Sequence, residues 1–298
     1  MDGFQTKTPA RAGLDYPVGD VPAPGETLEI LPGLHWVRMP LPFSLKWINL
    51  WLIDDGEAGW TIVDTGMPLD DTKKAWRKIF EEKLDGRPVW RIIVTHMHPD
   101  HTGGNENFGE MGTTIFGHDN VRTQMAIAGY AQEPPLITFN DELSFHINGE
   151  TVHVFKVPEA HTNGDVFIRF MGSNVVHTGD VYRTTTFPFI DLNNGGSFIG
   201  TIDALNLLLA VSDEETKIIP GHGGISNIAE VAAFRDMLVT IRDRVAAAIR
   251  DGMSLEEIQG AGLTAEYDER WAASGRIGGS ASMLAAVYAD LAALGVDR

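Results

Sequence analysis

The sequence predicts a layered α/β sandwich followed by a helical tail. Short apolar runs with the length and boundaries of strands alternate with helical patterns over residues 26–226, and neither kind of element forms a long series. From Asn227 onward the pattern is helical. We therefore expect an irregular arm over residues 1–25, a main domain over 26–226 and a helical extension over 227–298 that packs on the same domain.

The elements of the main domain follow from apolar runs and their boundaries. A helix begins near Pro68 and Asp70, because apolar residues at positions 76, 79, 80 and 84 fall on one helical face. A second helix is expected over residues 200–209, and Asp119 is the natural cap of a helix that begins near residue 117. Strands are expected at residues 27–31, 35–39, 47–53, 60–63, 89–94, 113–116, 142–146, 151–157, 166–170, 174–177 and 216–219.

Caps and apolar spacing divide the tail into helices. Asn227 and Glu230 have the spacing of a capping box and precede apolar residues that recur every three or four positions up to residue 249. Gly252 ends this helix, and Ser254 with Glu257 begins a shorter one. A last helix is expected over residues 281–294.

Composition narrows the classes of function. The chain has 298 residues, 43% of them hydrophobic and 21% charged, which is typical of a globular protein. Its net charge of −18 disfavours nucleic acids and anionic membranes as partners. The N-terminal residues lack the apolar core of a signal peptide, so we expect a cytoplasmic protein, or a periplasmic one if a leader has been removed. Because there is no cysteine, any metal must be held by His, Asp and Glu.

The densest group of chemically active side chains follows the apolar strand at residues 89–94. His96, His98, Asp100 and His101 lie within six positions there, and the glycines at 103 and 104 let the backbone fold back. His96 and His98 alternate as on a strand end, so both rings can point the same way. Burying these groups without partners would be costly, and a metal site explains their convergence.

Further candidate ligands also lie beside strands. His161 lies between two strands, whereas Asp180 and His222 follow strand ends, each next to glycine. With the first cluster and Asp64, this order of residues resembles the metallo-β-lactamase superfamily, and shorter stretches at 105–108 and 187–191 resemble its bacterial, cyclase-like branch of uncharacterised hydrolases. The resemblance implies an αββα sandwich whose site lies at one sheet edge.

The same resemblance implies a site with two Zn²⁺ ions per chain, although iron or manganese would also suit some ligands. His96, His98 and His161 would hold the first ion, Asp100, His101 and His222 the second, and Asp180 would bridge them, with Asp64 supporting the ligands from behind. A shared hydroxide would attack a carbonyl group of a small-molecule substrate, with Asp100 handling the proton. Tyr182 could donate a hydrogen bond to that substrate, or could simply pack.

This interpretation predicts a hydrolase of esters, lactones or thioesters, with β-lactams as a side activity. Dedicated β-lactamases of the superfamily generally lack a carboxylate at the position of Asp180. The alternatives are a true β-lactamase, an iron-dependent sulfur dioxygenase and a non-enzymatic binding module with the same fold. The helical tail leaves a homodimer open.

Overall fold

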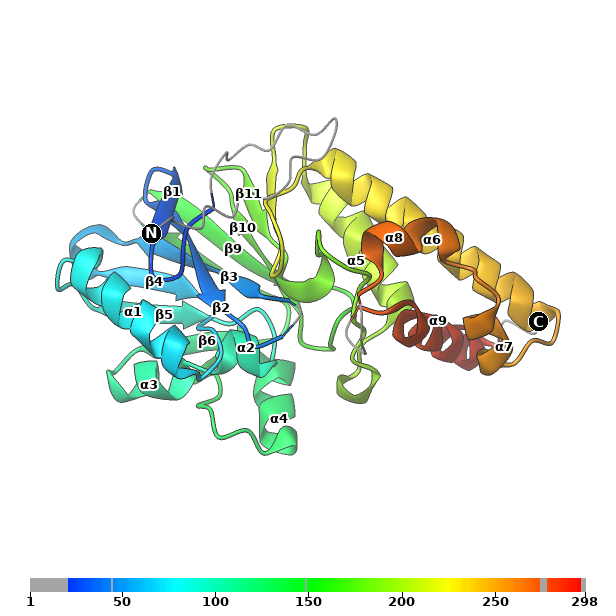
Figure 1. Ribbon diagram of the computed structural model, residues 1–298. Coiled ribbons are helices and arrows are strands. Elements are labelled where there is room, and N and C mark those ends of the chain that lie inside the picture. Colours follow the sequence, from blue (N-terminus) through cyan, green and yellow to red (C-terminus); the bar gives the residue numbers. More distant parts are fainter. Residues whose placement is uncertain (1–20, 44, 148, 274–277, 296–298) are drawn as a thin grey trace, which may run out of the picture.

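The protein is an αββα sandwich with a group of C-terminal helices, seen here in a computed structural model (Figure 1). The structure describes residues 21–43, 45–147, 149–273 and 278–295, so most of the expected arm over residues 1–25 lies outside it. Two sheets pack face to face, and helices cover the outer face of each. The predicted fold class is therefore confirmed.

The first sheet contains seven strands in the order in which they occur along the chain. Strands β1 to β4 pair antiparallel, whereas β4 to β7 pair parallel. The parallel part places the carboxyl ends of β4 and β5 at one edge of the sheet. The strands are β1 (Thr27–Leu31), β2 (Leu34–Pro40), β3 (Trp47–Asp54), β4 (Trp60–Val63), β5 (Val89–Ile93), β6 (Thr114–His118) and β7 (Ile137–Phe139).

The second sheet contains five strands in the order β12-β11-β10-β9-β8. Only β11 and β12 pair parallel, so their carboxyl ends also lie side by side. The strands are β8 (Glu142–Ile147), β9 (Glu150–Lys156), β10 (Val166–Phe170), β11 (Val175–His177) and β12 (Lys217–Ile219).

Three apolar clusters form the layers of the sandwich. Alternate residues of strand β3 belong to two of these clusters. Leu50 and Leu52 face the helices outside the first sheet, whereas Trp51 and Ile53 face the second sheet. The helices on the first sheet are α1 (Asp70–Glu82), α2 (Pro99–Thr102), α3 (Asn105–Glu110) and α4 (Asp119–Ala128). Helix α5 (Phe198–Val211) covers the second sheet.

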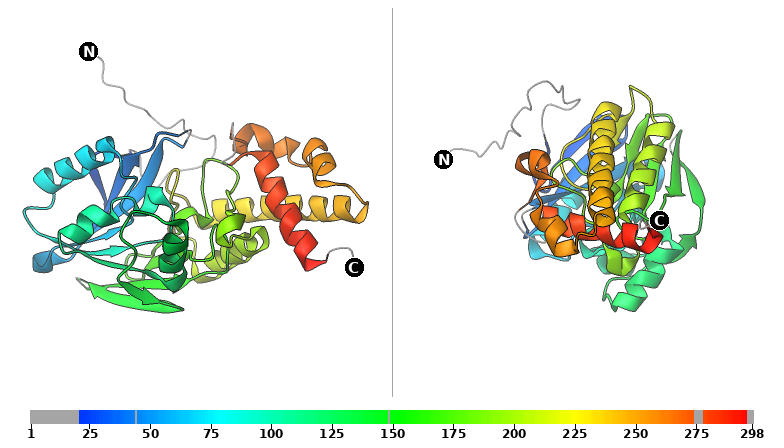
Figure 2. Two further views of the ribbon diagram at one scale, coloured as in Figure 1. Left: turned by 90° about the horizontal axis from the view of Figure 1, so that it is seen from below. Right: turned by 90° about the vertical axis from the view of Figure 1, so that its right-hand side faces the viewer.

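The C-terminal helices continue the layer that α5 begins. Helix α6 (Ile228–Arg250) lies alongside α5, and α9 (Ser280–Leu294) crosses both (Figure 2). Helices α7 (Leu255–Gly260) and α8 (Ala265–Trp271) lie in the segment that connects α6 to α9. Apolar residues of α6 and α9 share one core with Phe167 and Val176 of the second sheet, which explains the helical pattern of the tail. In the part of the chain that the structure describes, no helix has the length and hydrophobicity of a membrane span.

The caps agree only in part with the expectations from sequence. Ser254 and Glu257 form the full capping box at α7, and Asn227 caps α6 by accepting a hydrogen bond from the Glu230 amide. The Glu230 carboxylate instead accepts from the hydroxyl of Ser226. The expectation that Asp119 caps α4 is wrong, because the cap is the His118 ring, which accepts from the Asn120 amide at 3.0 Å.

Candidate metal centre

The candidate ligands gather where the parallel strands of both sheets end. His96, His98, Asp100 and His101 follow β5, Asp180 follows β11, and His222 follows β12. His161 comes from the loop between β9 and β10. Since the carboxyl ends of β4 and β5 face those of β11 and β12 across the sandwich, segments far apart in the sequence meet at one edge.

A first group of imidazoles consists of His96, His98 and His161. One nitrogen from each ring lies within 4.8 Å of the others, and Nδ1 of His98 lies 2.8 Å from Nε2 of His161. Three nitrogens that converge in this way can hold one metal ion.

A second group consists of Asp100, His101 and His222, whose ligand atoms also lie within 4.8 Å of one another. Asp180 lies between the groups. Its carboxylate oxygens are 3.3 Å from Nε2 of His101, 3.2 Å from Nε2 of His222 and 3.8 Å from Nε2 of His161. The structure therefore brings together all seven residues named from the sequence as ligands.

Backbone carbonyls orient two of the ligand rings. Nδ1 of His161 donates to the Phe189 carbonyl, and Nδ1 of His222 donates to the Trp47 carbonyl. Nε2 of each ring therefore faces the site, where it can bind a metal ion once it carries no proton. Nε2 of His96 is buried and has no hydrogen-bond partner among the described residues, whereas Nε2 of His101 and Oδ1 of Asp180 face each other at 3.3 Å. Buried polar atoms without partners are costly, so these residues fit a metal ion.

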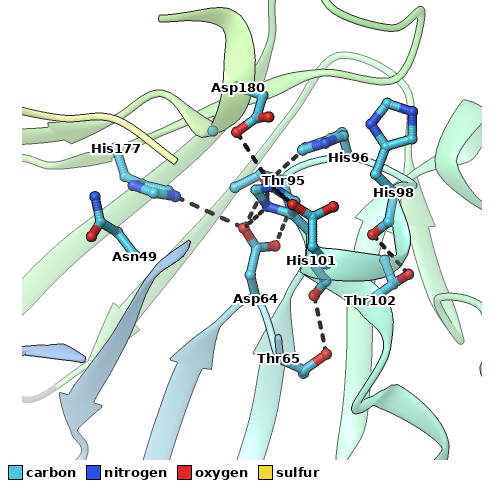
Figure 3. A network of polar contacts seen from close by, with 12 residues as sticks. Asn49, Asp64, Thr65, Thr95, His96, His98, His101, Thr102, His177 and Asp180 are labelled. Atoms are coloured by element: carbon cyan, nitrogen blue, oxygen red, sulfur yellow. Dashed lines mark hydrogen bonds and ion pairs between the residues drawn. The ribbon is translucent and has the colours of Figure 1, made fainter. Parts of the chain in front are cut away.

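Asp64 supports the ligands from behind, as Figure 3 shows. Its backbone is left-handed, with φ of 58°, which turns its carboxylate under Thr95 at the end of β5. Oδ1 accepts from the Thr95 amide at 2.8 Å, and Oδ2 accepts from Nδ1 of His101 at 2.7 Å. Burial works to raise the pKa of Asp64, but His101 and His177 hold it below its ordinary value. Asp64 therefore holds the His101 ring with Nε2 toward the site.

The two groups differ in their affinity for protons. Burial, together with repulsion from His98, lowers the pKa of His161 to about 3. Burial also works to lower the pKa of His222, but Asp180 and Asp100 raise it to about 9. The carboxylates thus make the second group attractive to cations, whether protons or metal ions.

The structure adds three residues that the sequence did not single out as parts of the site. Nη2 of Arg183 donates to Asp180 at 2.6 Å, and Nε2 of His98 donates to Asp191 at 2.8 Å. Asn49, on β3, donates to the carbonyls of Pro220 and Gly223 and so fixes the turn that carries His222. Asp191 ends the stretch 187–191 that resembles the bacterial branch, but the sequence contains no signal that identifies the partners of Arg183 and Asp191.

Tyr182, named as a candidate catalytic residue, lies in the core. Its hydroxyl is 2.8 Å from Oγ of Ser226, and its ring meets Phe234 of α6 edge to face. This position favours packing, which was the alternative drawn from the sequence. Histidines 35, 118, 146, 153 and 177, all near strands, also lie outside the ligand groups formed by the described residues.

Comparisons with known proteins bear on the family and the fold. The sequence pattern of the metallo-beta-lactamase superfamily matches residues 48–222. A β-lactamase domain protein from Burkholderia ambifaria has the same fold, with a TM-score of 0.76 and 25% identity over 94% of this chain and 92% of that one.

Two curated relatives carry names that describe reactions. The linear primary-alkylsulfatase of Pseudomonas sp. (strain ATCC 19151) is 23% identical over 68% of this chain, and an atrochrysone carboxyl ACP thioesterase of Pseudocercospora fijiensis is 26% identical over 72%. The matches span only 48% and 65% of those relatives. The chain belongs to the metallo-β-lactamase superfamily, as its motifs predict.

Proposed function

We propose that this chain is a binuclear zinc-dependent hydrolase that opens a carbonyl bond of a small molecule. One observation carries the proposal: a single carboxylate, Asp180, lies within 3.8 Å of ligand nitrogens from both groups, that of His161 in the first and those of His101 and His222 in the second. A shared carboxylate is what holds two cations close together, because its negative charge offsets their repulsion.

The donor set favours zinc. Imidazole nitrogens with carboxylates and no thiolate suit Zn²⁺, and the chain has no cysteine. In this proposal His96, His98 and His161 hold the first ion, Asp100, His101 and His222 hold the second, and Asp180 contacts both. When bound, such a pair of ions supplies an acidic water and polarises a carbonyl oxygen.

Asp100 is the residue that we propose to accept the proton. Its side chain is 20% exposed, against 5% for Asp180, so it lies on the side open to substrate. Burial works to raise the pKa of Asp100, but His101 and His222 hold it well below its usual range, and the carboxylate is therefore ionised. Its Oδ2 is 3.3 Å from Nε2 of His222, which fixes its position.

The proposed substrates are esters, lactones and thioesters, with β-lactams as a side activity. The thioesterase relative supports an acyl substrate, because its name describes the cleavage of a thioester. The alkylsulfatase relative favours a second candidate, the hydrolysis of a sulfate ester at the same centre. A small molecule is the only partner that the proposal requires.

Elemental analysis followed by a substrate panel tests the proposal. After purification without chelator we expect about two ions per chain, mostly zinc. About one iron ion with negligible zinc would instead support the sulfur dioxygenase, and the absence of turnover on acyl, sulfate and lactam substrates by the zinc-loaded chain would support a binding module. His96→Ala should empty the first group and His222→Ala should weaken the second, whereas His146→Ala, on an exposed position of β8, should leave both filled.

A further inference from the structure

One loop, residues 189–196, accepts hydrogen bonds from two of the three rings in the first group, those of His161 and His98. The carbonyl of Phe189 accepts from Nδ1 of His161 at 2.6 Å, and the carboxylate of Asp191 accepts from Nε2 of His98 at 2.8 Å. We propose that Asp191 is the positioning residue of the first metal site, where it fixes the His98 ring and adds a carboxylate behind a group of three imidazoles. This inference rests on the proposed two-metal centre.

The His98 ring is held at both nitrogens. Because a carboxylate only accepts, Nε2 must carry the proton that Asp191 receives as a hydrogen bond. Nδ1 is then the lone-pair nitrogen, and it is the atom that lies 2.8 Å from Nε2 of His161. A carboxylate behind a ligating histidine sets both its tautomer and its orientation and makes the inward nitrogen more basic.

Asp191 is itself fixed, which a positioning residue requires. Nδ2 of Asn194 donates to Oδ2 of Asp191 at 2.7 Å, and the Asp191 amide donates to the His161 carbonyl at 2.9 Å. Gly196 donates its amide to the Asp191 carbonyl at 2.8 Å, and any Cβ at Gly196 would lie 2.4 Å from the His161 carbonyl. The loop therefore packs closely against the backbone of His161, which fixes the position of Asp191 beside the first group.

The charges of the two groups explain why the first one needs this residue. The second group contains Asp100, whereas the first consists of three imidazoles and no carboxylate, and Asp180 lies within 4.8 Å of ligand atoms of His96 and His101. Asp191, with a side chain 12% exposed, places a further carboxylate directly behind His98. A loop acid that only capped a turn would not need this contact.

Capping of the turn is the competing role. Oδ1 of Asp191 accepts from the Asn194 amide at 3.3 Å, at the start of the short 3-10 helix Leu192–Asn194. Asp213 provides a matched control, because it also caps a turn, accepting from the Glu215 amide at 3.0 Å, and it is exposed. Asp213→Ala therefore measures what the loss of a capping acid does to the protein.

The test measures zinc affinity by competition with a chromophoric chelator in a His222→Ala background, where the second group is weakened. We expect Asp191→Ala to weaken binding by ~10–100-fold, the usual effect of losing such a partner, and Asp191→Asn to restore part of the affinity because its amide oxygen still accepts from His98. The melting temperature of the chelator-treated protein should change no more in Asp191→Ala than in Asp213→Ala.

Unchanged zinc affinity in Asp191→Ala would overturn the inference and leave the proposed function standing. A loss of affinity that Asp213→Ala matches, or that accompanies a much lower melting temperature than Asp213→Ala shows, would also overturn it, because the role would then be structural. If the parent chain with His222 intact binds no zinc, the proposed function and the inference fail together.

Discussion

Nη2 of Arg183 lies 2.6 Å from Oδ2 of Asp180, and both side chains are buried. Nε and Nη1 of Arg183 have no hydrogen-bond partner among the described residues, so Asp180 is the hydrogen-bonded partner of this guanidinium. Oδ1 of Asp180 is left facing Nε2 of His101 at 3.3 Å. Arg183 thus donates to Oδ2, the oxygen that also lies 3.2 Å from Nε2 of His222, so both oxygens of the central carboxylate face ligand groups.

Replacing Arg183 should destabilise the protein most when no metal is bound. Removing one partner of a buried ion pair costs about 3–5 kcal/mol, because the other charge is left without compensation. We expect Arg183→Met to lower the free energy of unfolding of the chelator-treated protein by about 3–5 kcal/mol. Zinc should restore much of this free energy, because it supplies positive charge beside Asp180. Urea unfolding with and without zinc measures this difference.

Arg242 provides the control for this substitution, because its pair with Asp243 lies at the surface. Arg242→Met should cost less than about 1 kcal/mol. An equal and small loss in the two variants would show that the Arg183–Asp180 pair contributes little to stability.

The position of Asp180 can be tested without changing its charge. A Cβ added at Gly221 would lie 2.2 Å from Oδ1 of Asp180, and the Gly221 amide is fixed by a 2.7 Å hydrogen bond to the Gly179 carbonyl. Gly221→Ala should therefore push the carboxylate aside, whereas Gly260→Ala, which meets nothing within 4 Å, should not.

We expect Gly221→Ala and Asp180→Asn to share one phenotype. Both should lower occupancy of the second site, and Asp180→Asn should cut turnover at least ~100-fold, about 2.7 kcal/mol of barrier. Metal content and kcat are measured on the same preparations. Full turnover with both metals retained in Asp180→Asn would contradict a bridging role.

Zinc binding at the two sites should depend differently on pH. The pKa of His222 is raised from 6.5 to about 9, so its proton stabilises the folded metal-free chain fully below pH 6.5, and this contribution is lost as the pH rises through 9. Zinc must displace that proton, so affinity for the second ion should rise about tenfold per pH unit across this window for each proton released.

The first site should lack this dependence, because the pKa of His161 is lowered to about 3 and its ring is already neutral. Competition titrations at several pH values, with the parent chain and His222→Ala, separate the two sites. A second-site affinity that stays flat from pH 6.5 to pH 9 would contradict the assignment of His222 to that site.

The residues that gather at this edge could be named as candidate ligands from the sequence, partly from local patterns and partly from the family resemblance. Four of the ligands lie between His96 and His101, directly after an apolar strand, and Gly179 and Gly221 mark the close backbone approaches beside Asp180 and His222. The sandwich was predictable for a similar reason. Its strands are apolar runs bounded by glycine, proline or aspartate, and its helices are recognised by apolar residues spaced three or four positions apart.

The partners of the ligands could not be predicted in this way. Asp191 contacts His98 across 93 positions of sequence, and a lone aspartate in a loop more often caps a turn. The strand β7 has only three residues and exists through its parallel pairing with β6, which no local pattern specifies. His118 caps α4 although aspartate is the commoner cap, because its ring is also held by the Asn140 carbonyl at 2.7 Å.

The last prediction concerns the choice between esters and β-lactams. Asp180 places a negative charge beside both ligand groups, and by the resemblance dedicated β-lactamases generally lack a carboxylate there. A second ion that already contacts Asp180 is less able to stabilise the anionic nitrogen that leaves a cleaved lactam. The Arg183 guanidinium offsets part of the negative charge of Asp180. It is buried and paired with Asp180, so it does not stabilise the leaving nitrogen itself.

Lactones and esters should be less affected, because their leaving oxygen is a better leaving group. The net charge of −18 also gives no general attraction for carboxylate-bearing antibiotics. We therefore expect kcat/KM for the best β-lactam to be at least ~10-fold below that for the best ester or lactone, about 1.4 kcal/mol of transition-state stabilisation. A side-by-side assay of penicillin, cephalosporin, carbapenem, lactone, thioester and alkyl sulfate on the zinc-loaded protein measures the ratio. Turnover of a β-lactam near ~10⁶ M⁻¹s⁻¹, a value ordinary for a dedicated enzyme, with poor activity on esters and lactones, would reverse the conclusion.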